Sequence, residues 1–287
     1  MKTAIVTDSN SGIFQEEARA LGISSIPMPV IIEGETRFEN QDITHPEFFQ
    51  ALSEGKDVSS SQPSPGTVIE LWKTLLKDHD EVVYIPMSSG LSGSCAASMV
   101  LANEFDGKVQ VVDNHRISVT MRQAVQRAAA LAKEGLSAKE IKARLEEEGP
   151  MSCVYLTVET LAYFKKSGRV TPTTAAIGDI LNIKPVLMTK GEKFETCAKV
   201  HGAIKAKATM LKAVQKDRET IFADYPDEKI YIGAASSCTD EADAEKWFQK
   251  VKEAFPDYTV YYDPLSLSIS CHTGPDACGI GISLKPE

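Results

Sequence analysis

The stretch VVYIPMSSGLSG, residues 82–93, runs from an apolar segment into a turn of serines and glycines, with helix-forming residues after it. Val82 to Ile85 are β-branched or aromatic and stop at Pro86, which predicts a buried strand of an α/β sheet. The helix after turn 88–93 would begin with unpaired backbone N–H groups, and such a helix end attracts anions. The stretch therefore predicts a site for a carboxylate, a phosphate or an oxyanion. A helix cap with spare serines is the alternative.

Composition excludes several classes of function. The chain has 287 residues, is 43% hydrophobic and carries a formal net charge of −9, which opposes nucleic-acid binding. Its six cysteines form no Cys-x-x-Cys pair, so we expect no metal site and interpret them as buried thiols of a cytosolic protein. We see no signal peptide and no apolar run long enough to span a membrane. These observations predict a cytoplasmic protein without a cofactor.

Strands and helices alternate over the first half of the chain. Strands at 3–7 and 109–112 join the one at 82–85, and helices are expected at 14–21, at 121–133 and at 137–148. Thr44 and Ser64 have the character of N-cap residues. The prolines beside the strand at 30–32 favour an edge position. The pattern predicts a mainly parallel, doubly wound sheet with helices on both faces, in a domain comprising residues 1–150.

The pattern changes after Gly149 and Pro150. A strand at 153–158, a helix at 173–181 and a hairpin from 186 to 198 predict a second, α+β domain over residues 151–287. Helices at 203–221 and 240–255 alternate with strands at 229–235 and 259–262. His272 is expected in a Gly/Pro-rich loop near the end of the chain.

Five segments together resemble the DegV family of bacterial fatty-acid-binding proteins, in the order and spacing of that family. They are TDSNSGI at 7–13, SSSQPSP at 59–65, SSGLSGS at 88–94, KKSGRVTPTTAAIGDILNIKPVL at 165–187 and CHTGPDACGIG at 271–281. The resemblance implies two α/β domains with an acyl chain in a tunnel between them. Some members are the carrier subunits of a fatty acid kinase, and they present the carboxylate to a separate kinase subunit.

The resemblance also implies which residues hold the carboxylate. Ser60 and Ser61 fall on the family's TSQPS motif, and Ser89 and Ser92 fall on its SSxLSGT motif. His272 matches the histidine of the HTGPGA motif. We therefore expect hydroxyls and this histidine to bind the head group.

Three further positions bear on the resemblance. Asp276 stands where the family usually has glycine. Arg169 matches a basic position and is expected to contact a partner or, transiently, a membrane; a solvated surface charge is the alternative. His201 replaces a basic residue of the family's KVRTR cluster, which weakens the inference of a kinase partner.

Burial of the acyl tail would supply most of the affinity, since roughly 14 methylenes at about 0.8 kcal/mol each give about 11 kcal/mol before costs. We therefore interpret the chain as a non-enzymatic carrier of a long-chain fatty acid. A site of this kind would bind another amphiphilic acid, such as a retinoid or an acyl intermediate, equally well.

A serine hydrolase is the main alternative, because Ser92, Asp263 and His272 occur in the order of an α/β-hydrolase triad. A phosphotransferase is weaker, since the chain has no phosphate-binding glycine loop followed by lysine.

Overall fold

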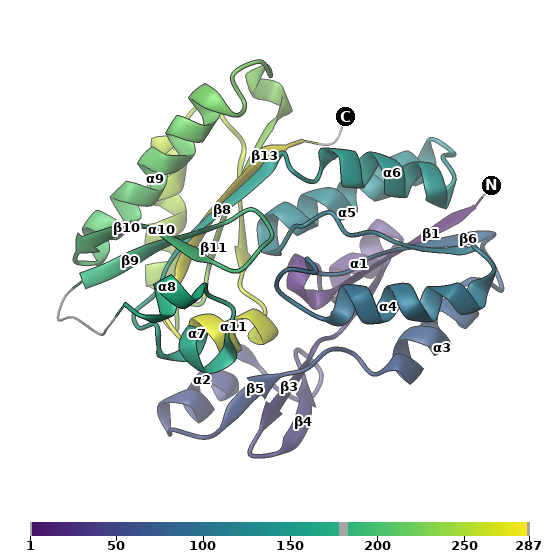
Figure 1. Ribbon diagram of the computed structural model, residues 1–287, viewed down its shortest axis with the longest axis horizontal. Helices are drawn as coiled ribbons and strands as arrows, with labels where there is room; N and C mark the ends of the chain where they lie inside the picture. Colours follow the sequence, from purple (N-terminus) through teal and green to yellow (C-terminus); the bar gives the residue numbers. More distant parts are fainter. Residues whose placement is uncertain (1, 178–182, 286–287) are drawn as a thin grey trace.

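The computed structural model describes residues 2–177 and 183–285. Three sheets organise the chain, and Figure 1 shows the largest and the four-stranded one side by side, with the smallest below them. The strands are β1 (Thr3–Asp8), β2 (Ser24–Ile26), β3 (Pro29–Ile32), β4 (Glu35–Phe38), β5 (Val58–Ser60), β6 (Glu81–Ile85), β7 (Val109–Val111), β8 (Ser152–Thr157), β9 (Ile183–Thr189), β10 (Glu195–His201), β11 (Ile230–Ser236), β12 (Val260–Pro264) and β13 (Cys278–Leu284).

The helices alternate with these strands for most of the chain. They are α1 (Gln15–Leu21), α2 (His45–Ser53), α3 (Pro65–Leu75), α4 (Ser94–Ala102), α5 (Ser118–Lys133), α6 (Ala138–Glu148), α7 (Ala162–Ser167), α8 (Pro172–Ala175), α9 (Ala203–Thr220), α10 (Glu241–Ala254) and α11 (Leu267–Thr273), with short 3-10 helices at Ser9–Ser11, Asn103–Phe105 and Asp227–Lys229. Among the described residues, no helix is long and apolar enough to cross a membrane.

The four-stranded sheet confirms the predicted parallel architecture. Its order is β2-β1-β6-β7, and every neighbouring pair is parallel. Trp72 and Tyr84 pack edge to face beneath one side, while residues of α5 and α6 cover the other. The expected caps at Thr44 and Ser64 are present: Thr44 forms a capping box, and Ser64 accepts a hydrogen bond from the backbone of Thr67. Ser137 forms a second capping box at the start of α6.

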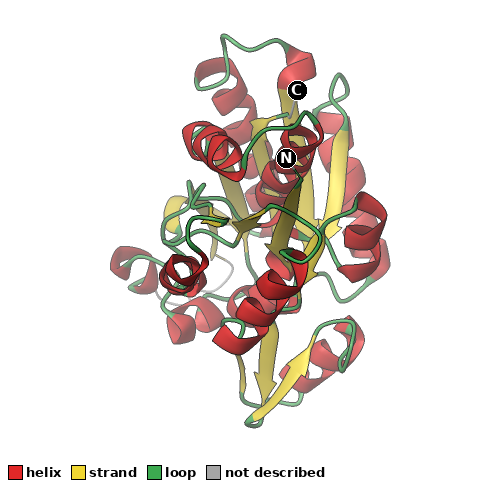
Figure 2. Cartoon of the chain, turned by 90° about the vertical axis from the view of Figure 1, so that its right-hand side faces the viewer, coloured by secondary structure: helices red, strands yellow, loops and turns green. Residues whose placement is uncertain are grey.

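A small antiparallel sheet, β4-β3-β5, corrects one prediction. The strand at 30–32 is its central strand rather than an edge. Pro29 is tolerated because it is the first residue of β3, where its carbonyl accepts a hydrogen bond from the backbone N–H of Ser61 at 3.1 Å. Strands β4 and β5 are three or four residues long and were not predicted. Figure 2 shows this sheet projecting from the rest of the chain.

The six-stranded sheet has the order β10-β9-β8-β13-β11-β12 and is mainly antiparallel, with only β11 and β12 parallel. The predicted hairpin is β9 and β10, and α9 and α10 cover one face of the sheet (Figure 1). The predicted helix at 173–181 appears in the described part as the short helix α8, and its residues 178–181 lie outside that part. His272 lies in the last turn of helix α11, not in a loop; Ser266 caps that helix.

Helix α5 joins the two larger sheets. It contacts β1 on one side and β11 and β13 on the other, so most of its residues are buried. Its Arg122 donates to the Asp263 carboxylate on β12 at 2.6 Å, to the Gly12 carbonyl at 2.8 Å, and to Glu17 on α1. Burial raises the pKa of Asp263 to about 6 even though Arg122 opposes the change. This network ties the N-terminal strands and helices to the edge of the six-stranded sheet.

The cysteines depart in part from the expectation of burial. Four of them are buried, but Cys238 is half-buried and Cys197 is exposed on β10.

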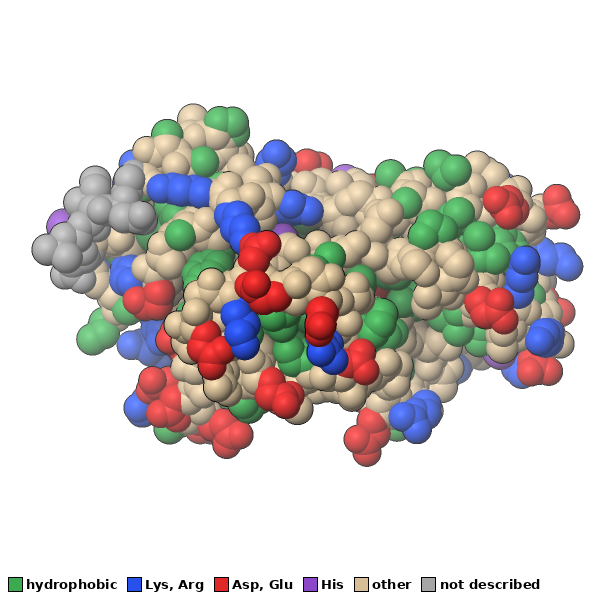
Figure 3. All heavy atoms as spheres, turned by 90° about the horizontal axis from the view of Figure 1, so that it is seen from below, with side chains coloured by type: hydrophobic (Ala, Val, Ile, Leu, Met, Phe, Trp, Pro, Cys, Tyr) green, Lys and Arg blue, Asp and Glu red, His purple; other side chains and the backbone are tan. Residues whose placement is uncertain are grey.

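The face seen from below carries acidic and basic side chains that are interspersed rather than segregated (Figure 3).

Candidate functional site

An apolar cavity lies among the serine turn, the start of α5, helix α11 and the six-stranded sheet. It encloses about 590 Å³ including its opening, and its lining comes from both sides of Gly149. Met87, Leu91 and Ile117 contribute from the first half of the chain; Leu156, Phe164 and Phe194 contribute from the second. These residues belong to one continuous buried cluster. Removing an apolar ligand from water would be favourable here, because almost the whole surface is hydrocarbon.

A small number of polar groups break the apolar lining, and His272 is the central one. Its Nε2 lies 2.9 Å from Oγ of Ser60, at the end of β5. Its Nδ1 is buried and has no hydrogen-bond partner among the described residues. Burial, assisted by the positive charge of Arg169, lowers the pKa of His272 to about 4, so the imidazole is neutral at pH 7. Ser60 and His272, both expected at the head group, lie next to each other although 212 positions separate them.

Arg169 lines the same cavity. It follows α7 and the left-handed Gly168, and its Nε donates to the Leu91 carbonyl at 3.3 Å. A second nitrogen, Nη1, donates to the Ser167 carbonyl. The side chain is half-buried, not a fully solvated charge. Sequence reasoning placed this residue at a partner or membrane contact and did not associate it with the cavity. That contact stays a prediction.

The serine turn between β6 and α4 is held by buried groups that were not among the predicted site residues. The carboxylate of Asp8 accepts hydrogen bonds from the backbone N–H of Met87 at 3.1 Å and of Asn10 at 2.9 Å. Burial raises the pKa of Asp8 to about 6. Ser88, not Ser89, is the buried serine, and its Oγ accepts a bond from Gly90 N–H at 3.2 Å while donating to the Gly191 carbonyl.

None of the predicted serines lines the cavity in the described structure, and Ser60 is linked to it through His272. Ser92 is half-buried, and its Oγ accepts from the backbone N–H of Ser94 at 3.2 Å, at the start of α4. Ser89 and Ser61 are exposed; the Ser61 hydroxyl donates to the Gln62 carbonyl at 3.2 Å. Ser92 is nevertheless close to the polar groups, because the peptide that precedes it is the one that accepts from Arg169.

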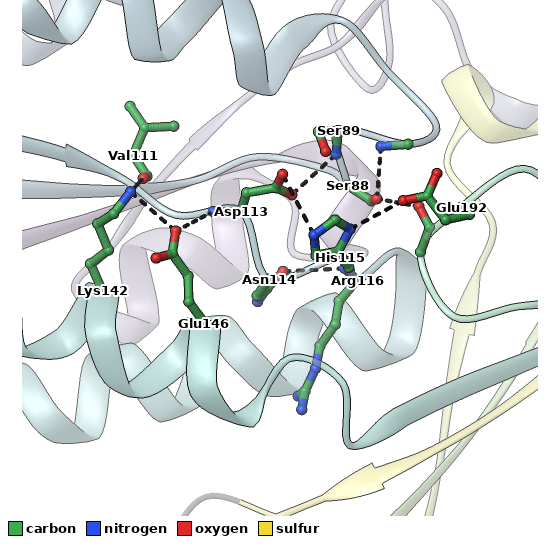
Figure 4. A network of polar contacts seen from close by, with 12 residues as sticks. Ser88, Ser89, Val111, Asp113, Asn114, His115, Arg116, Lys142, Glu146 and Glu192 are labelled. Carbon is green, nitrogen blue, oxygen red and sulfur yellow. Dashed lines mark hydrogen bonds and ion pairs between the residues drawn. The ribbon is translucent and has the colours of Figure 1, made fainter.

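The turn of the β9–β10 hairpin rests on the serine turn (Figure 4). His115 lies between two carboxylates, with ring nitrogens 3.8 Å from Asp113 and 3.7 Å from Glu192. Asp113 also accepts a bond from the Ser89 backbone at 3.2 Å. A Cβ on Gly191 would lie 2.3 Å from the His115 carbonyl oxygen, so only glycine permits this approach.

Helix α11 is fixed to the small sheet at two points. At its N-terminus, the buried carboxylate of Glu39 accepts from the backbone N–H of Leu267 at 3.0 Å and lies 2.7 Å from His45 Nε2. Near its C-terminus is the contact between Ser60 and His272. Apolar side chains between the two points, among them Val30, Phe48, Leu267 and Cys271, form one buried cluster. The position of His272 therefore depends on how the small sheet packs.

The alternative triad is not assembled. Asp263 is engaged by Arg122, and the ring nitrogens of His272 meet Ser60 on one side and no described partner on the other. The imidazole has no carboxylate partner and no hydrogen bond to Ser92, so these three residues do not form the triad that a serine hydrolase requires. Within residues 2–177 and 183–285, no group of histidines, cysteines and carboxylates is arranged to hold a metal ion.

Asp276, where the family usually has glycine, adopts the left-handed conformation with φ of 57°. Aspartate tolerates this region better than most residues. Its Oδ1 accepts from the backbone N–H of Thr239 at 3.0 Å and from the hydroxyl of Thr239 at 3.1 Å. The departure from glycine therefore leaves the turn intact.

Comparisons with known proteins agree with this architecture. A DegV domain-containing protein of Staphylococcus aureus strain N315 is 30% identical over 288 residues, covering 99% of each chain. One of Deinococcus radiodurans is 34% identical over 217 residues, which is 75% of this chain and 77% of the relative.

Solved structures share the whole fold. A DegV family protein from Thermus thermophilus, described by its fatty acid binding, superposes with a TM-score of 0.87 at 30% identity and covers 99% of this chain and 100% of its own. DegV of Bacillus subtilis, described as a fatty acid binding protein, gives 0.86 at 25% identity with the same coverage. The family profile described as "Uncharacterised protein, DegV family" matches residues 2–285. The chain therefore belongs to the DegV family.

Proposed function

We propose that this chain binds a long-chain fatty acid, with the acyl tail in the apolar cavity and the carboxylate beside Ser60, His272 and Arg169. The observation that carries the proposal is the composition of the cavity: hydrocarbon over nearly all of its surface, and a few polar side chains that include a cation. An amphiphilic acid matches both features. The names of the Thermus and Bacillus relatives support the same ligand class.

The unpartnered Nδ1 of His272 supports the placement of the head group. A buried polar atom without a partner costs about 1 to 3 kcal/mol, and a ligand oxygen or water within reach would remove that cost. Because the imidazole is neutral at pH 7, it can donate one hydrogen bond while Ser60 interacts with its other nitrogen. The guanidinium of Arg169 would neutralise the carboxylate.

We propose that Ser92 is a further hydrogen-bond donor to the carboxylate. Ser61 and Ser89, which were also predicted to bind the ligand, are proposed to lie farther from it. The proposal for Ser92 is supported by its position, because it directly follows Leu91, whose carbonyl accepts a hydrogen bond from Arg169. The exposure of Ser61 and Ser89 favours a role in shaping the two loops.

We further propose that the protein acts as a carrier rather than as an enzyme, with the ligand between residues 1–150 and residues 151–287. The proposal is supported by the separation of Ser92, His272 and Asp263, because the Asp263 carboxylate is bound by Arg122 instead of by His272. Presentation of the ligand to a separate fatty acid kinase subunit remains a proposal. The exposed His201 at the end of β10 would then occupy a position where the family has a basic residue.

The direct test is mass spectrometry of small molecules released when the purified protein is denatured. We expect a stoichiometric long-chain fatty acid, because a tail buried in this cavity should survive purification. Delipidated protein should then rebind palmitate or oleate in calorimetry. Failure to retain or rebind any fatty acid would refute the proposal, and release of a different amphiphilic acid would replace the ligand class.

Variants locate the head group. Ser60→Ala and Arg169→Gln should each weaken fatty acid binding by about 5- to 100-fold, equivalent to about 1 to 3 kcal/mol for a lost partner of a buried charge. Arg37→Gln is the matched control, since Arg37 pairs with Glu35 on the exposed side of the small sheet. Unchanged affinity in both site variants would place the carboxylate elsewhere.

A further inference from the structure

Two cysteines outside the acyl cavity lie next to each other where β11 and β13 pair. Ser236 at the end of β11 is the register partner of Cys278 at the start of β13. The pairing continues past the strand ends, because Ser237 N–H donates to the Ala277 carbonyl at 3.0 Å. Cys238 follows directly, and its side chain packs against the buried cluster that contains Cys278. The hydrogen bonds from β11 into the loop before β13 hold this arrangement in place.

The two thiols differ in exposure. Cys278 is fully buried, whereas Cys238 is half-buried and lines a surface groove bordered by α10, α2 and β12. Glu241 and Glu245 of α10 line the same groove. A small neutral oxidant can therefore reach Cys238 from solvent, while Cys278 is shielded behind it.

The surroundings of Cys238 favour its thiolate. A hydrogen bond from the Cys278 thiol, another from Ser236 and the positive charge of Lys207 together lower the pKa of Cys238 to about 7, against the effects of burial and of Asp276. Lys207 comes from α9, where its ammonium lies 5.8 Å from the ring centroid of Trp247. The thiolate is the nucleophilic form of cysteine, so reactivity should concentrate at this position.

We propose that Cys238 and Cys278 form a peroxide-sensitive thiol pair, in which Cys238 is oxidised first and Cys278 resolves it to a disulfide. The Cys238 thiolate attacks one oxygen of hydrogen peroxide, the O–O bond breaks, and hydroxide leaves and takes up a proton as water. The resulting sulfenic acid is attacked by the Cys278 sulfur, which forms the S–S bond and releases a second water. In total, two thiols are oxidised and one peroxide is reduced to two waters.

Cys197 provides an internal control. It is the most exposed of the six cysteines, but desolvation between its strand neighbours raises its pKa and its thiol donates to the Val186 carbonyl at 3.3 Å. If exposure alone governed reactivity, Cys197 would react first. The proposed pair reverses that order, because Cys238 has both a neighbouring thiol and a neighbouring cation.

The test treats reduced, full-length protein with a small molar excess of hydrogen peroxide, blocks the remaining thiols with maleimide after denaturation, and measures intact mass. We expect two fewer maleimide groups than the six of reduced protein, and a peptide cross-link between Cys238 and Cys278. Cys197→Ser should likewise lose two maleimide groups and form the same cross-link. A full set of six adducts after treatment, or a cross-link that involves Cys197, would overturn the proposal.

Two variants test the order of events. In Cys278→Ala, Cys238 should accumulate as a sulfenic acid that dimedone captures. In Lys207→Met, alkylation of Cys238 in the folded protein should slow several-fold while alkylation of Cys197 does not change. Dimedone capture at Cys197 instead, or an equal rate for Cys238 with and without the lysine, would contradict the assigned roles. The measurements on the unmutated chain decide the proposal even if a buried substitution at Cys278 impairs folding.

Discussion

Replacing Asp8 with asparagine should change the pH dependence of stability, because Asp8 is a fully buried carboxylate that anchors the serine turn through Met87. Burial raises its pKa from 3.8 to about 6. Between these values the folded protein holds more protons than the unfolded chain, so stability falls as pH rises through that window. The difference of about 2 pKa units corresponds to about 3 kcal/mol when both limits are reached.

Asp8→Asn removes this titration but also loses one acceptor for the backbone N–H of Met87 or Asn10. The second effect costs about 1 to 3 kcal/mol and does not depend on pH. We therefore expect the variant to be less stable than the original chain at pH 4 and to recover by about 2 to 3 kcal/mol relative to it at pH 7. Urea denaturation of both proteins at each pH measures the difference.

The comparison between the two proteins cancels every other titrating group that the substitution leaves undisturbed. Asp257→Asn is the control, since Asp257 is an exposed aspartate far from the serine turn in sequence. A stability difference for Asp8→Asn that stays constant from pH 4 to pH 7 would show that the buried carboxylate does not titrate as the structure indicates.

Two further predictions concern how the site is supported. Gly90→Ala should lower the free energy of unfolding by about 1 to 3 kcal/mol, because its Cβ would lie 2.5 Å from the carbonyl oxygen of Gly191. Gly93→Ala is the control and should leave stability unchanged, since a Cβ there has no neighbour within 3.6 Å. Equal effects of the two substitutions in thermal or urea denaturation would contradict the contact. Glu39→Gln should speed hydrogen exchange across α11, since the carboxylate holds Leu267 N–H, and unchanged exchange would refute this anchoring role.

Local pattern was sufficient for the elements whose residues determine their own structure. The strand at 82–85 is buried on both faces, so a continuous run of β-branched and aromatic residues predicted it. The caps at Thr44 and Ser64 were predicted because capping depends on side chains within three residues. The hairpin at 186–198 was found from its Lys-Gly-Glu turn, although the register shift in β10 could not be seen.

Helix α11 could not be predicted in the same way. It is seven residues long and lies between Ser266 and the Gly274-Pro275 turn, which made the whole segment resemble a loop. An isolated helix of that length is unstable, so its structure depends on tertiary contacts. Leu267 and Cys271 supply those contacts by packing on the small sheet, whose strands β4 and β5 were themselves too short to predict.

One part of the candidate site, the serine turn, could be predicted from local sequence, whereas its other polar groups come together only in the folded chain. The serine turn was correctly placed after its strand, but its buried hydroxyl, Ser88, is used to dock the β9–β10 hairpin. Arg169, which follows α7, and His272 on α11 are polar groups of the cavity, whereas Ser60 on β5 contacts His272 without lining the cavity itself. Ser60 reaches His272 because the small sheet packs on α11. Arg169 illustrates the consequence: its charge suggested an outside partner, and its position depends on a bond to the Leu91 carbonyl. A turn whose buried hydroxyl joins the two halves has fewer hydroxyls free for a ligand, so under the proposed function the carboxylate would be bound mainly by residues from distant segments.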